Sequence, residues 1–169
     1  MELVELRRIT AQQLAELEGD EDDPWDAGSS VLRWRPKAWH AVLRDDDGRL
    51  VAAAGLVLTD VEVSGERFAA VGLGGVIVNS HHRGRGHAGA VVTAAIAHAE
   101  QLGPELALLF CHPDRMGLYR KFGFAEVTAP VSVEQPSGPV KMTMRTMWRA
   151  LRPGATWPGG SVAVRGLPF

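Results

Sequence analysis

The sequence predicts an α/β (α+β) fold, a mixed, mostly antiparallel central sheet of about six to seven strands with helices on both faces. Three observations lead to this prediction. Residues 37–78 hold three apolar stretches separated by short turns of Asp, Ser and Gly. Residues 88–102 change to helical spacing, and the apolar stretch 105–111 follows at once. A strand, a helix and a strand in this order imply one parallel pair in an otherwise antiparallel sheet.

The N-terminal elements are expected in the order strand, helix, loop. Residues 3–9 (LVELRRI) can form a first strand. A helix follows, with Thr10 as N-cap and with Leu14 and Leu17 three apart on one face. Residues 18–30 (EGDEDDPWDAGSS) are acidic and rich in helix breakers, so we expect a loop. This loop is either simply solvated or an acidic lip that attracts a cationic substrate.

The next three strands are expected as an antiparallel meander. Two of them, residues 37–44 and 50–63, are joined by the turn sequence DDDG. The third, residues 67–78, follows a Ser-Gly turn. Three of the five tryptophans come before the centre of this sheet, and we expect them to pack in the core or under the loop, or Trp25 or Trp34 to line an acceptor pocket.

The C-terminal half begins with the predicted helix, which Gly103 and Pro104 end. Residues 105–111 are nearly all apolar, as in a strand covered on both faces. A further helix is expected over residues 113–123, with Pro113 near its start and Gly123 after its end.

The chain then closes with two predicted strands and a tail. The strands are expected over residues 124–127 and 139–147. The Pro/Gly-rich tail, residues 149–169, is expected to pack on the single domain formed by residues 1–148. Residues 161–164 (SVAV) can add one short edge strand.

Composition excludes several classes of protein. The net charge of −2 argues against a dedicated nucleic-acid binder. No apolar run approaches the roughly 18 residues of a membrane span, and the N-terminus lacks the apolar region of a secretory signal. A single cysteine, Cys111, rules out an internal disulfide framework and fits a cytoplasmic location.

The junction GGVIVNSHHRGRGHAGAVV predicts a site for an anion. A helix that begins near Gly86 has unpaired backbone N–H groups and the positive end of its dipole in the first turn. Glycines let a ligand approach that backbone closely, and Arg83 and Arg85 add charged donors. A strand, a Gly-rich turn with two arginines and a helix therefore suit a phosphate or pyrophosphate.

Two familiar phosphate motifs do not fit this junction. The G-K-[ST] ending of a P-loop is missing. Gly84, Gly86 and Gly89 match the dinucleotide spacing G-x-G-x-x-G by letter, but the preceding strand closes a meander. No acidic residue ends a following strand to hold a ribose.

The spacing Arg83-x-x-Gly86-x-Ala88 resembles the acyl-CoA pyrophosphate motif of the GCN5-related N-acetyltransferase (GNAT) superfamily. Residues 118–124 (LYRKFGF) are similar to its second signature, and the order of strands and helices also matches. The resemblance covers residues 3 to about 147. Through GVIV…RGRG and APVSVEQPSGP there is a weaker similarity to the aminoglycoside 2′-N-acetyltransferase-like members.

This resemblance implies an acetyl-CoA site with acetyl-CoA (coenzyme A) as co-substrate. The backbone of the strand end would pair with the pantetheine arm, and the N–H groups of the turn would hold the pyrophosphate. Gly74 and Gly75 can host a bulge that opens the strand for the ligand. The cofactor-binding residues are expected to be Val76, Ile77, Val78, Arg83, Gly84, Arg85, Gly86, His87 and Ala88.

The resemblance also implies the catalytic residues Tyr119 and His112. Tyr119, the only tyrosine, occupies the position whose hydroxyl protonates the departing CoA thiolate in the family. His112 stands where many members carry Asn, and it either contacts the cofactor, takes a proton from the acceptor amine through water or has only a structural role. Cys111 lies in an apolar strand, which favours direct transfer without a covalent enzyme intermediate.

The general base is open, because relatives often place a Glu in the strand before the turn. This chain has Gly72, Leu73, Gly74 and Gly75 there. The candidates for the base are Glu126, Asp114, His40 and His112.

The sequence leaves the acceptor and the assembly open. We expect a small-molecule amine acceptor, no nucleic acid, no membrane and no metal, and a homodimer stays open. Two other functions stay open as well: a non-catalytic acyl-CoA sensor or interaction module, and a binder of nucleotide phosphates.

Overall fold

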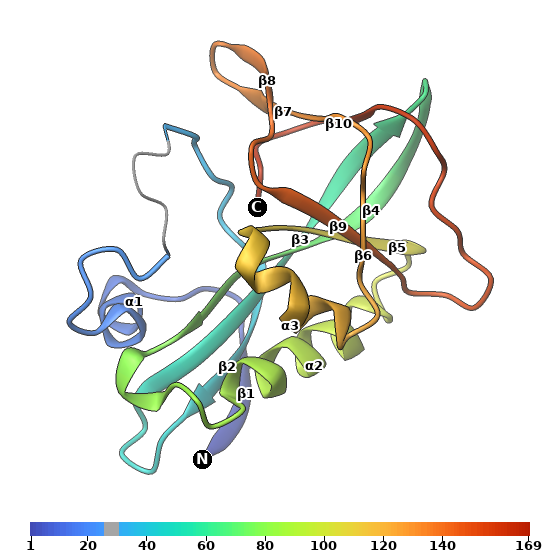
Figure 1. The fold of residues 1–169 in the computed structure, drawn as a ribbon. Helices are drawn as coiled ribbons and strands as arrows, with labels where there is room; N and C mark the ends of the chain where they lie inside the picture. The colour runs from blue at the N-terminus through green and yellow to red at the C-terminus, as the bar shows by residue number, and fades with distance from the viewer. Residues whose placement is uncertain (26–30) are drawn as a thin grey trace. The chain divides into compact units, whose positions relative to one another are not determined.

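The computed structural model describes residues 1–25 and 31–169, and Figure 1 shows the fold. The helices of this part of the chain are α1 (Ala11–Glu18), η1 (Ser80–His82), α2 (His87–Ala99), η2 (Pro113–Arg115) and α3 (Met116–Arg120), of which η1 and η2 are 3₁₀ helices. Its strands are β1 (Glu2–Leu6), β2 (Trp39–Arg44), β3 (Leu50–Val63), β4 (Glu66–Val78), β5 (Leu106–Cys111), β6 (Ala125–Glu126), β7 (Val131–Gln135), β8 (Gly138–Lys141), β9 (Arg145–Ala150) and β10 (Val162–Val164). A membrane would need a longer and more apolar helix than any of those described here.

The described strands form one mixed, mostly antiparallel sheet, which confirms the predicted fold class. The hydrogen-bonded order is β6, β9, β5, β4, β3, β10, β7 and β8, with β2 beside β3 and β1 beside β2. The predicted parallel pair is β4 with β5, through residues 71–73 and 107–109. The ten described strands exceed the six to seven expected, because residues 131–141 form the additional hairpin β7–β8 and the tail supplies β10.

Two predictions for the C-terminal part are wrong. Residues 139–147 were expected as one strand, but β8 ends at Lys141 and β9 begins at Arg145. These two strands have different partners, since β8 pairs with β7, and β9 pairs with β5 and β6. The strand of the tail, β10, is also internal instead of at an edge, because it pairs with β3 on one side and with β7 on the other.

The chain packs as two compact units. The first comprises the described residues of 1–31, 37–56 and 74–98. The second comprises residues 32–36, 57–73 and 99–169. Strands β3 and β4 contribute residues to both.

In the first unit, α1 packs on one face of the strands. The Thr10 hydroxyl accepts a hydrogen bond from Gln13 N–H, and the Gln13 side chain accepts one from Thr10 N–H, which makes a capping box at the predicted N-cap. Leu17 of α1 is buried in a cluster with side chains of β2, β3 and β4: Val42, Leu50, Ala53 and Ile77. Leu14 stays 37% exposed, so of the two predicted apolar positions only Leu17 enters the core.

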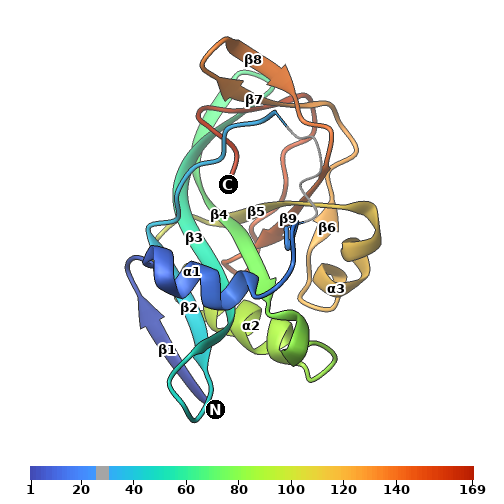
Figure 2. The same cartoon turned by 90° about the vertical axis from the view of Figure 1, so that its left-hand side faces the viewer.

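Helix α2 covers the opposite face of the first unit. Trp39 of β2 stacks on His98 of α2, with ring centroids 4.0 Å apart and an angle of 7° between the planes. Side chains alternate across a strand, so Trp39 and Val42 point to opposite faces of β2. Within this unit, helices therefore lie on both faces, as predicted, and Figures 1 and 2 show α1 and α2 on either side of the strands.

The second unit has its own core, which includes the C-terminal tail. Val162, Val164 and Phe169 are buried there together with Leu108 and Phe110. The ring of Phe169 lies directly over Gly72 of β4, where an added Cβ would approach it to 2.6 Å. The tail is thus part of the packing of this unit.

Candidate functional site

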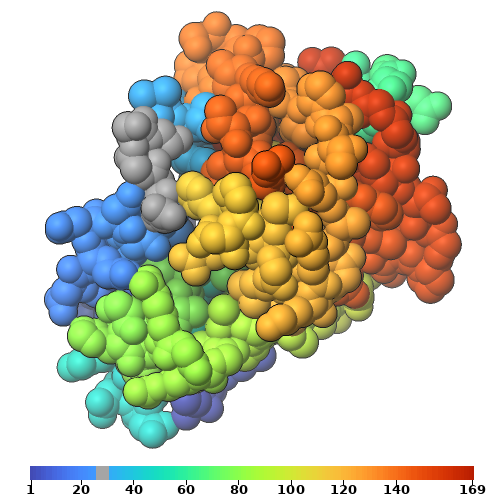
Figure 3. Space-filling model, in the orientation of Figure 1, coloured from blue at the N-terminus to red at the C-terminus, as the bar shows by residue number. Residues whose placement is uncertain are grey.

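The turn between β4 and α2 is open on its outer side. Gly84 and Gly86 have φ angles of 73° and 82°, in the left-handed region that glycine adopts without strain. A Cβ built on either residue would meet nothing within 4 Å. Neither Gly84 nor Arg85 hydrogen-bonds to any other described residue, and the first helical bond runs from Ala90 N–H to Gly86 O. The turn therefore presents unpaired donors at the positive end of α2, and Figure 3 shows it in lime green on the molecular surface.

Asn79 anchors the start of this turn, and the sequence analysis missed it. Its Oδ1 accepts a hydrogen bond from His81 N–H at 3.0 Å, which caps η1. Its Nδ2 donates to the carbonyl of Glu16 in α1 at 2.8 Å. A Cβ at Gly19, whose φ is 61°, would lie 2.8 Å from that nitrogen, so Gly19 lets the end of α1 approach. An Asn directly after an apolar strand and before a helical turn is a signal that identifies such a cap.

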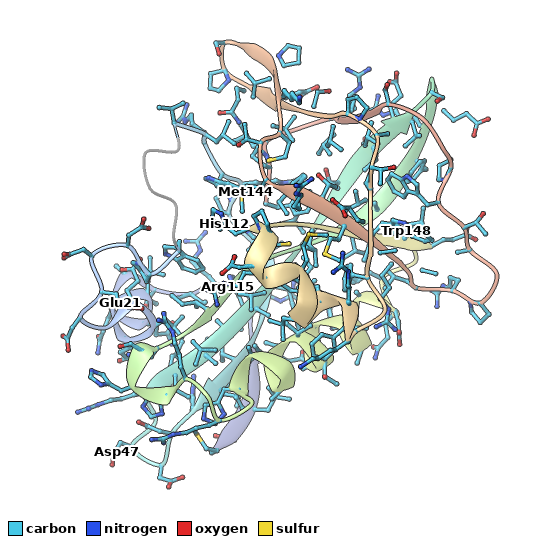
Figure 4. All side chains as sticks on the ribbon, in the orientation of Figure 1. Glu21, Asp47, His112, Arg115, Met144 and Trp148 are labelled. Carbon is cyan, nitrogen blue, oxygen red and sulfur yellow. The ribbon has the colours of Figure 1, made fainter. Side chains whose placement is uncertain are left out.

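Arg83 is held by other parts of the first unit. Its Nε donates to Val78 O at 3.1 Å. Its two terminal nitrogens bond the two carboxylate oxygens of Glu21, at 2.8 Å for the first, in a bidentate ion pair. Figure 4 labels Glu21 on the segment that follows α1. The predicted anion-binding side chain is therefore already occupied by an acidic residue of the loop.

Arg85 and the neighbouring histidines have a different environment. Arg85 is exposed, and no described residue pairs with it. The rings of His82 and His87 lie 6.3 Å apart, and His82 Nδ1 and His87 Nε2 are buried without a hydrogen-bond partner. His81 lies 3.4 Å from Asp20. Among the described residues, no three His, Cys, Asp or Glu side chains gather as they would around a metal ion.

The end of β4 carries the residues predicted to pair with pantetheine. Ile77 is buried in the core against α1, whereas Val76 and Val78 are half-buried. Gly75, just before them, has a φ of 60°, which is consistent with the predicted irregularity in this strand. Side chains alternate along a strand, so Ile77 points into the core, whereas the half-buried Val76 and Val78 do not.

Tyr119 lies in α3 of the second unit. It is 8% exposed and meets Phe124 edge to face, with ring centroids 6.2 Å apart. Its carbonyl accepts hydrogen bonds from Phe122 and Phe124 N–H, and Gly123 makes the turn with a φ of 79°. Burial raises the pKa of the Tyr119 phenol well above its usual value, the nearby Cys111 raises it further, and Arg115 opposes the shift. The phenol therefore stays protonated, as a proton donor must.

Cys111 ends β5 and is buried in the same unit. Its Sγ lies 3.9 Å from the Met147 sulfur. Burial, with smaller contributions from Asp114 and Glu126, raises the pKa of the thiol to about 11. At neutral pH almost none of it is thiolate, so its environment is that of a structural cysteine.

His112 follows Cys111 and begins η2, as Figure 4 shows. It is half-buried, and its side chain makes no capping hydrogen bond to η2. The structure thus places His112 and Tyr119 in one short segment of the second unit.

Two of the four candidate bases are engaged in ion pairs. Glu126 lies 3.3 Å from Arg145 and 4.0 Å from Arg120, and Asp114 lies 3.3 Å from Arg115. His40 is different, because it is half-buried in β2 and its Nδ1 lies 3.4 Å from Leu6 O. Burial lowers the pKa of His40, and Lys37 lowers it further against the opposing effect of the Leu6 carbonyl.

The second unit also contains a pocket of about 640 Å³ at the closing strands. Its walls come from residues 126–131, residues 141–146 and Pro113. Trp34 is not part of its lining, and packs instead against Phe110 with ring centroids 6.5 Å apart. Trp25 donates from Nε1 to Glu18 in the first unit at 3.3 Å.

Comparison with known proteins identifies one family. The acetyltransferase (GNAT) domain matches residues 12–127. No sequence among the curated proteins matches the chain.

Solved structures share the fold. The GNAT family N-acetyltransferase from Escherichia coli, crystallised with CoA, is 20% identical, with a TM-score of 0.61 over 98% of this chain and 94% of that one. A GNAT family acetyltransferase from Brucella melitensis in complex with acetyl-CoA is 18% identical, with a TM-score of 0.55 over 96% and 95%. A GNAT acetyltransferase from Staphylococcus aureus is 13% identical, with a TM-score of 0.55 over 89% and 100%. At these identities the likeness establishes the fold alone.

Proposed function

Because the chain belongs to the acetyltransferase (GNAT) domain family, we propose that it transfers an acetyl group from acetyl-CoA to an amine by direct attack of the amine on the thioester. The observation that carries the proposal is the open turn at the start of α2. Gly84 and Gly86 leave space for a ligand, and the N–H groups of Gly84 and Arg85 have no hydrogen-bond partner among the described residues. A diphosphate needs several donors, close backbone approach and positive potential, and this turn supplies all three.

The cofactor site that we propose lies entirely in the first unit. Residues 76–78 offer backbone to the pantetheine arm, and residues 83–88 hold the diphosphate. Arg85 supplies the side-chain cation, since the guanidinium of Arg83 is paired with Glu21. The crystal structures of the Escherichia coli and Brucella melitensis relatives with CoA and acetyl-CoA support this ligand.

The resemblance to the family assigns chemical roles to Tyr119 and His112. Tyr119 keeps its proton because it is buried, and it gives that proton to the departing thiolate. His112 contacts the cofactor or relays a proton through water. Cys111 takes no part, because its thiol is buried and protonated.

The acceptor that we propose is a small-molecule amine. An aminoglycoside belongs in the test because of the weaker resemblance to aminoglycoside 2′-N-acetyltransferase-like members. We place the reaction in the cytoplasm, with the protein as a monomer or homodimer.

Two measurements test this function. Calorimetry with CoA should show binding to the wild type and little or none to Gly86→Val, because a branched side chain at this φ closes the turn. Gly48→Val is the matched control, since Gly48 has a φ of 81° and equally open surroundings in the β2–β3 turn. Equal CoA binding by both variants would contradict the proposed site.

Thiol release from acetyl-CoA should then occur with at least one amine of a panel of benzylamine, spermidine, kanamycin and a lysine-containing peptide. CoA binding without any turnover would favour an acyl-CoA sensor instead, a function that the absence of a carboxylate from residues 72–75 permits. Thermal protection by ATP and not by acetyl-CoA would indicate a nucleotide binder.

A further inference from the structure

Two glycines and two basic side chains form a row across the strands of the first unit. His40 of β2 pairs with Gly55 of β3. The stem of Lys37 lies over Gly55, where a Cβ would meet its Cγ at 2.4 Å, and reaches Gly75 of β4, where a Cβ would lie 3.8 Å from its Cε. A larger residue at position 55 would displace Lys37. The row runs from β2 to the strand end that we propose for pantetheine.

This row lies on the face of the strands that α1 covers. Val42, Ala53 and Ile77 belong to the cluster around Leu17 of α1. His40, Gly55 and Gly75 are each two residues from one of these positions, and side chains two apart on a strand share a face. Lys37 shows that Gly55 and Gly75 share one face, because its stem contacts the positions above both glycines.

The imidazole of His40 has a defined orientation. Its Nδ1 lies 3.4 Å from the carbonyl of Leu6 in β1, and since a carbonyl only accepts, this contact favours the tautomer with the proton on Nδ1. Its Cδ2 lies 3.2 Å from the position of a Cβ on Gly55. Nε2 is bonded to Cδ2, so the edge of the ring that carries the lone pair is directed toward the glycine row.

His40 is also neutral where a base has to act. Burial lowers its pKa, and the charge of Lys37, which lies in the same row, adds to this effect. The Leu6 carbonyl is the group that opposes the shift. At pH 7 the ring is therefore unprotonated on Nε2 and ready to accept a proton.

Residues 72–75 of β4 carry no carboxylate, and two of their glycines disfavour a longer side chain. In the second unit, the Phe169 ring fills the space over Gly72, with a closest approach of 2.6 Å to an added Cβ. In the first unit, Gly75 has a left-handed φ, and Lys37 lies over it. A base must therefore come from another element.

We propose that His40 is the general base that takes the proton from the acceptor's ammonium group, an inference that rests on the proposed acetyl transfer. One N–H bond of the ammonium breaks, and its proton moves to Nε2. The freed lone pair forms the C–N bond to the thioester carbon, and the C–S bond breaks. The nitrogen loses a second proton when it becomes an amide, and this loss balances the proton that the thiolate takes up. His40 then releases its own proton to water.

The test compares His40→Gln with His98→Gln. His98 is the control because it is also a half-buried histidine of the first unit, but lies on α2 against the opposite face. With the best amine of the panel, His40→Gln should lower kcat by about 10²-fold or more, and leave the Kd for CoA within about twofold. The acidic limb of the kcat profile should disappear in this variant. In His40→Ala, added imidazole should restore part of the turnover.

Two outcomes would overturn the assignment. One is wild-type kcat and an unchanged pH profile in His40→Gln, while His112→Gln loses both. The other is a ¹⁵N imidazole spectrum of the wild-type protein that shows the proton on Nε2, or a charged ring, at pH 7. The spectrum is recorded on the wild-type protein, so it can overturn the assignment even if the variants do not fold. Turnover by the wild type with any amine separates a failure of this assignment from a failure of the proposed function.

Discussion

Arg83 and Glu21, 62 residues apart in the chain, form a bidentate ion pair at the turn that we assign to the diphosphate of CoA. The side chains are 48% and 30% exposed, so the pair is accessible to a ligand. An arginine that follows a strand and precedes a helix would be expected to face an anion from outside. In this structure the anion comes from the chain itself, so a diphosphate bound at this turn would compete with Glu21 for one guanidinium.

We therefore expect Glu21→Gln to bind CoA more tightly than the wild type, by ~2- to 5-fold, because removing the carboxylate removes both a competitor and a like charge beside the diphosphate. Calorimetry at low and at high salt measures this change, and salt should reduce it. Asp47→Asn is the matched control, since it removes one exposed charge in the β2–β3 turn (Figure 4). Weaker binding by Glu21→Gln would show that the pair orients Arg83 for the ligand.

Tyr119→Phe should lower kcat by about 10²-fold or more with little change in CoA affinity, because it removes only the proton donor. Burial raises the pKa of this phenol, so it stays protonated over the pH range of the assay. Steady-state kinetics from pH 6 to 10 should therefore show no basic limb that depends on Tyr119. Equal kcat for the two proteins would remove Tyr119 from the mechanism.

Cys111→Ala should keep its activity, since direct transfer needs no thiol. The same variant tests the raised pKa of Cys111. The thiol titrates near 9.0 when unfolded and at about 11 when folded, so the unfolded chain loses its proton first. The free energy of unfolding should consequently fall as pH rises from 9 toward 11, and it should fall less in Cys111→Ala. Chemical denaturation at pH 8, 9.5 and 10.5 measures the difference. Loss of turnover in a folded Cys111→Ala protein would point to a covalent route.

Gly72→Ala should destabilise the protein by about 1–3 kcal/mol, because its Cβ would enter the ring of Phe169. Gly117→Ala in α3 is the control, since no atom lies within 4 Å of that Cβ. Alanine is the better helix former, so this control should be neutral or more stable by about 0.5–1 kcal/mol. Denaturant titrations compare the two. If the clash is the cause, Gly72→Ala should cost less in a Phe169→Ala background than in the wild type, which a double-mutant cycle measures.

The sequence determined what neighbouring residues decide among themselves. Thr10 and Gln13 fix the start of α1, Asp and Gly fix the turn between β2 and β3, and Gly123 ends the α3 segment. The pattern of Arg83, Gly84 and Gly86 between a strand and a helix indicated an anion site for the same reason. Caps, turns and side-chain periods act over a few residues, so they can be recognised from the chain alone.

The tertiary structure decided everything that depends on partners far along the chain. It split residues 139–147 between two sheet neighbours, placed β10 between β3 and β7, and set Glu21 on Arg83. It also put Phe169 over Gly72, where no longer side chain fits, and Lys37 over Gly55 beside His40. A glycine has no side chain to indicate which atoms will occupy the space above it. Only the folded chain brings those atoms there.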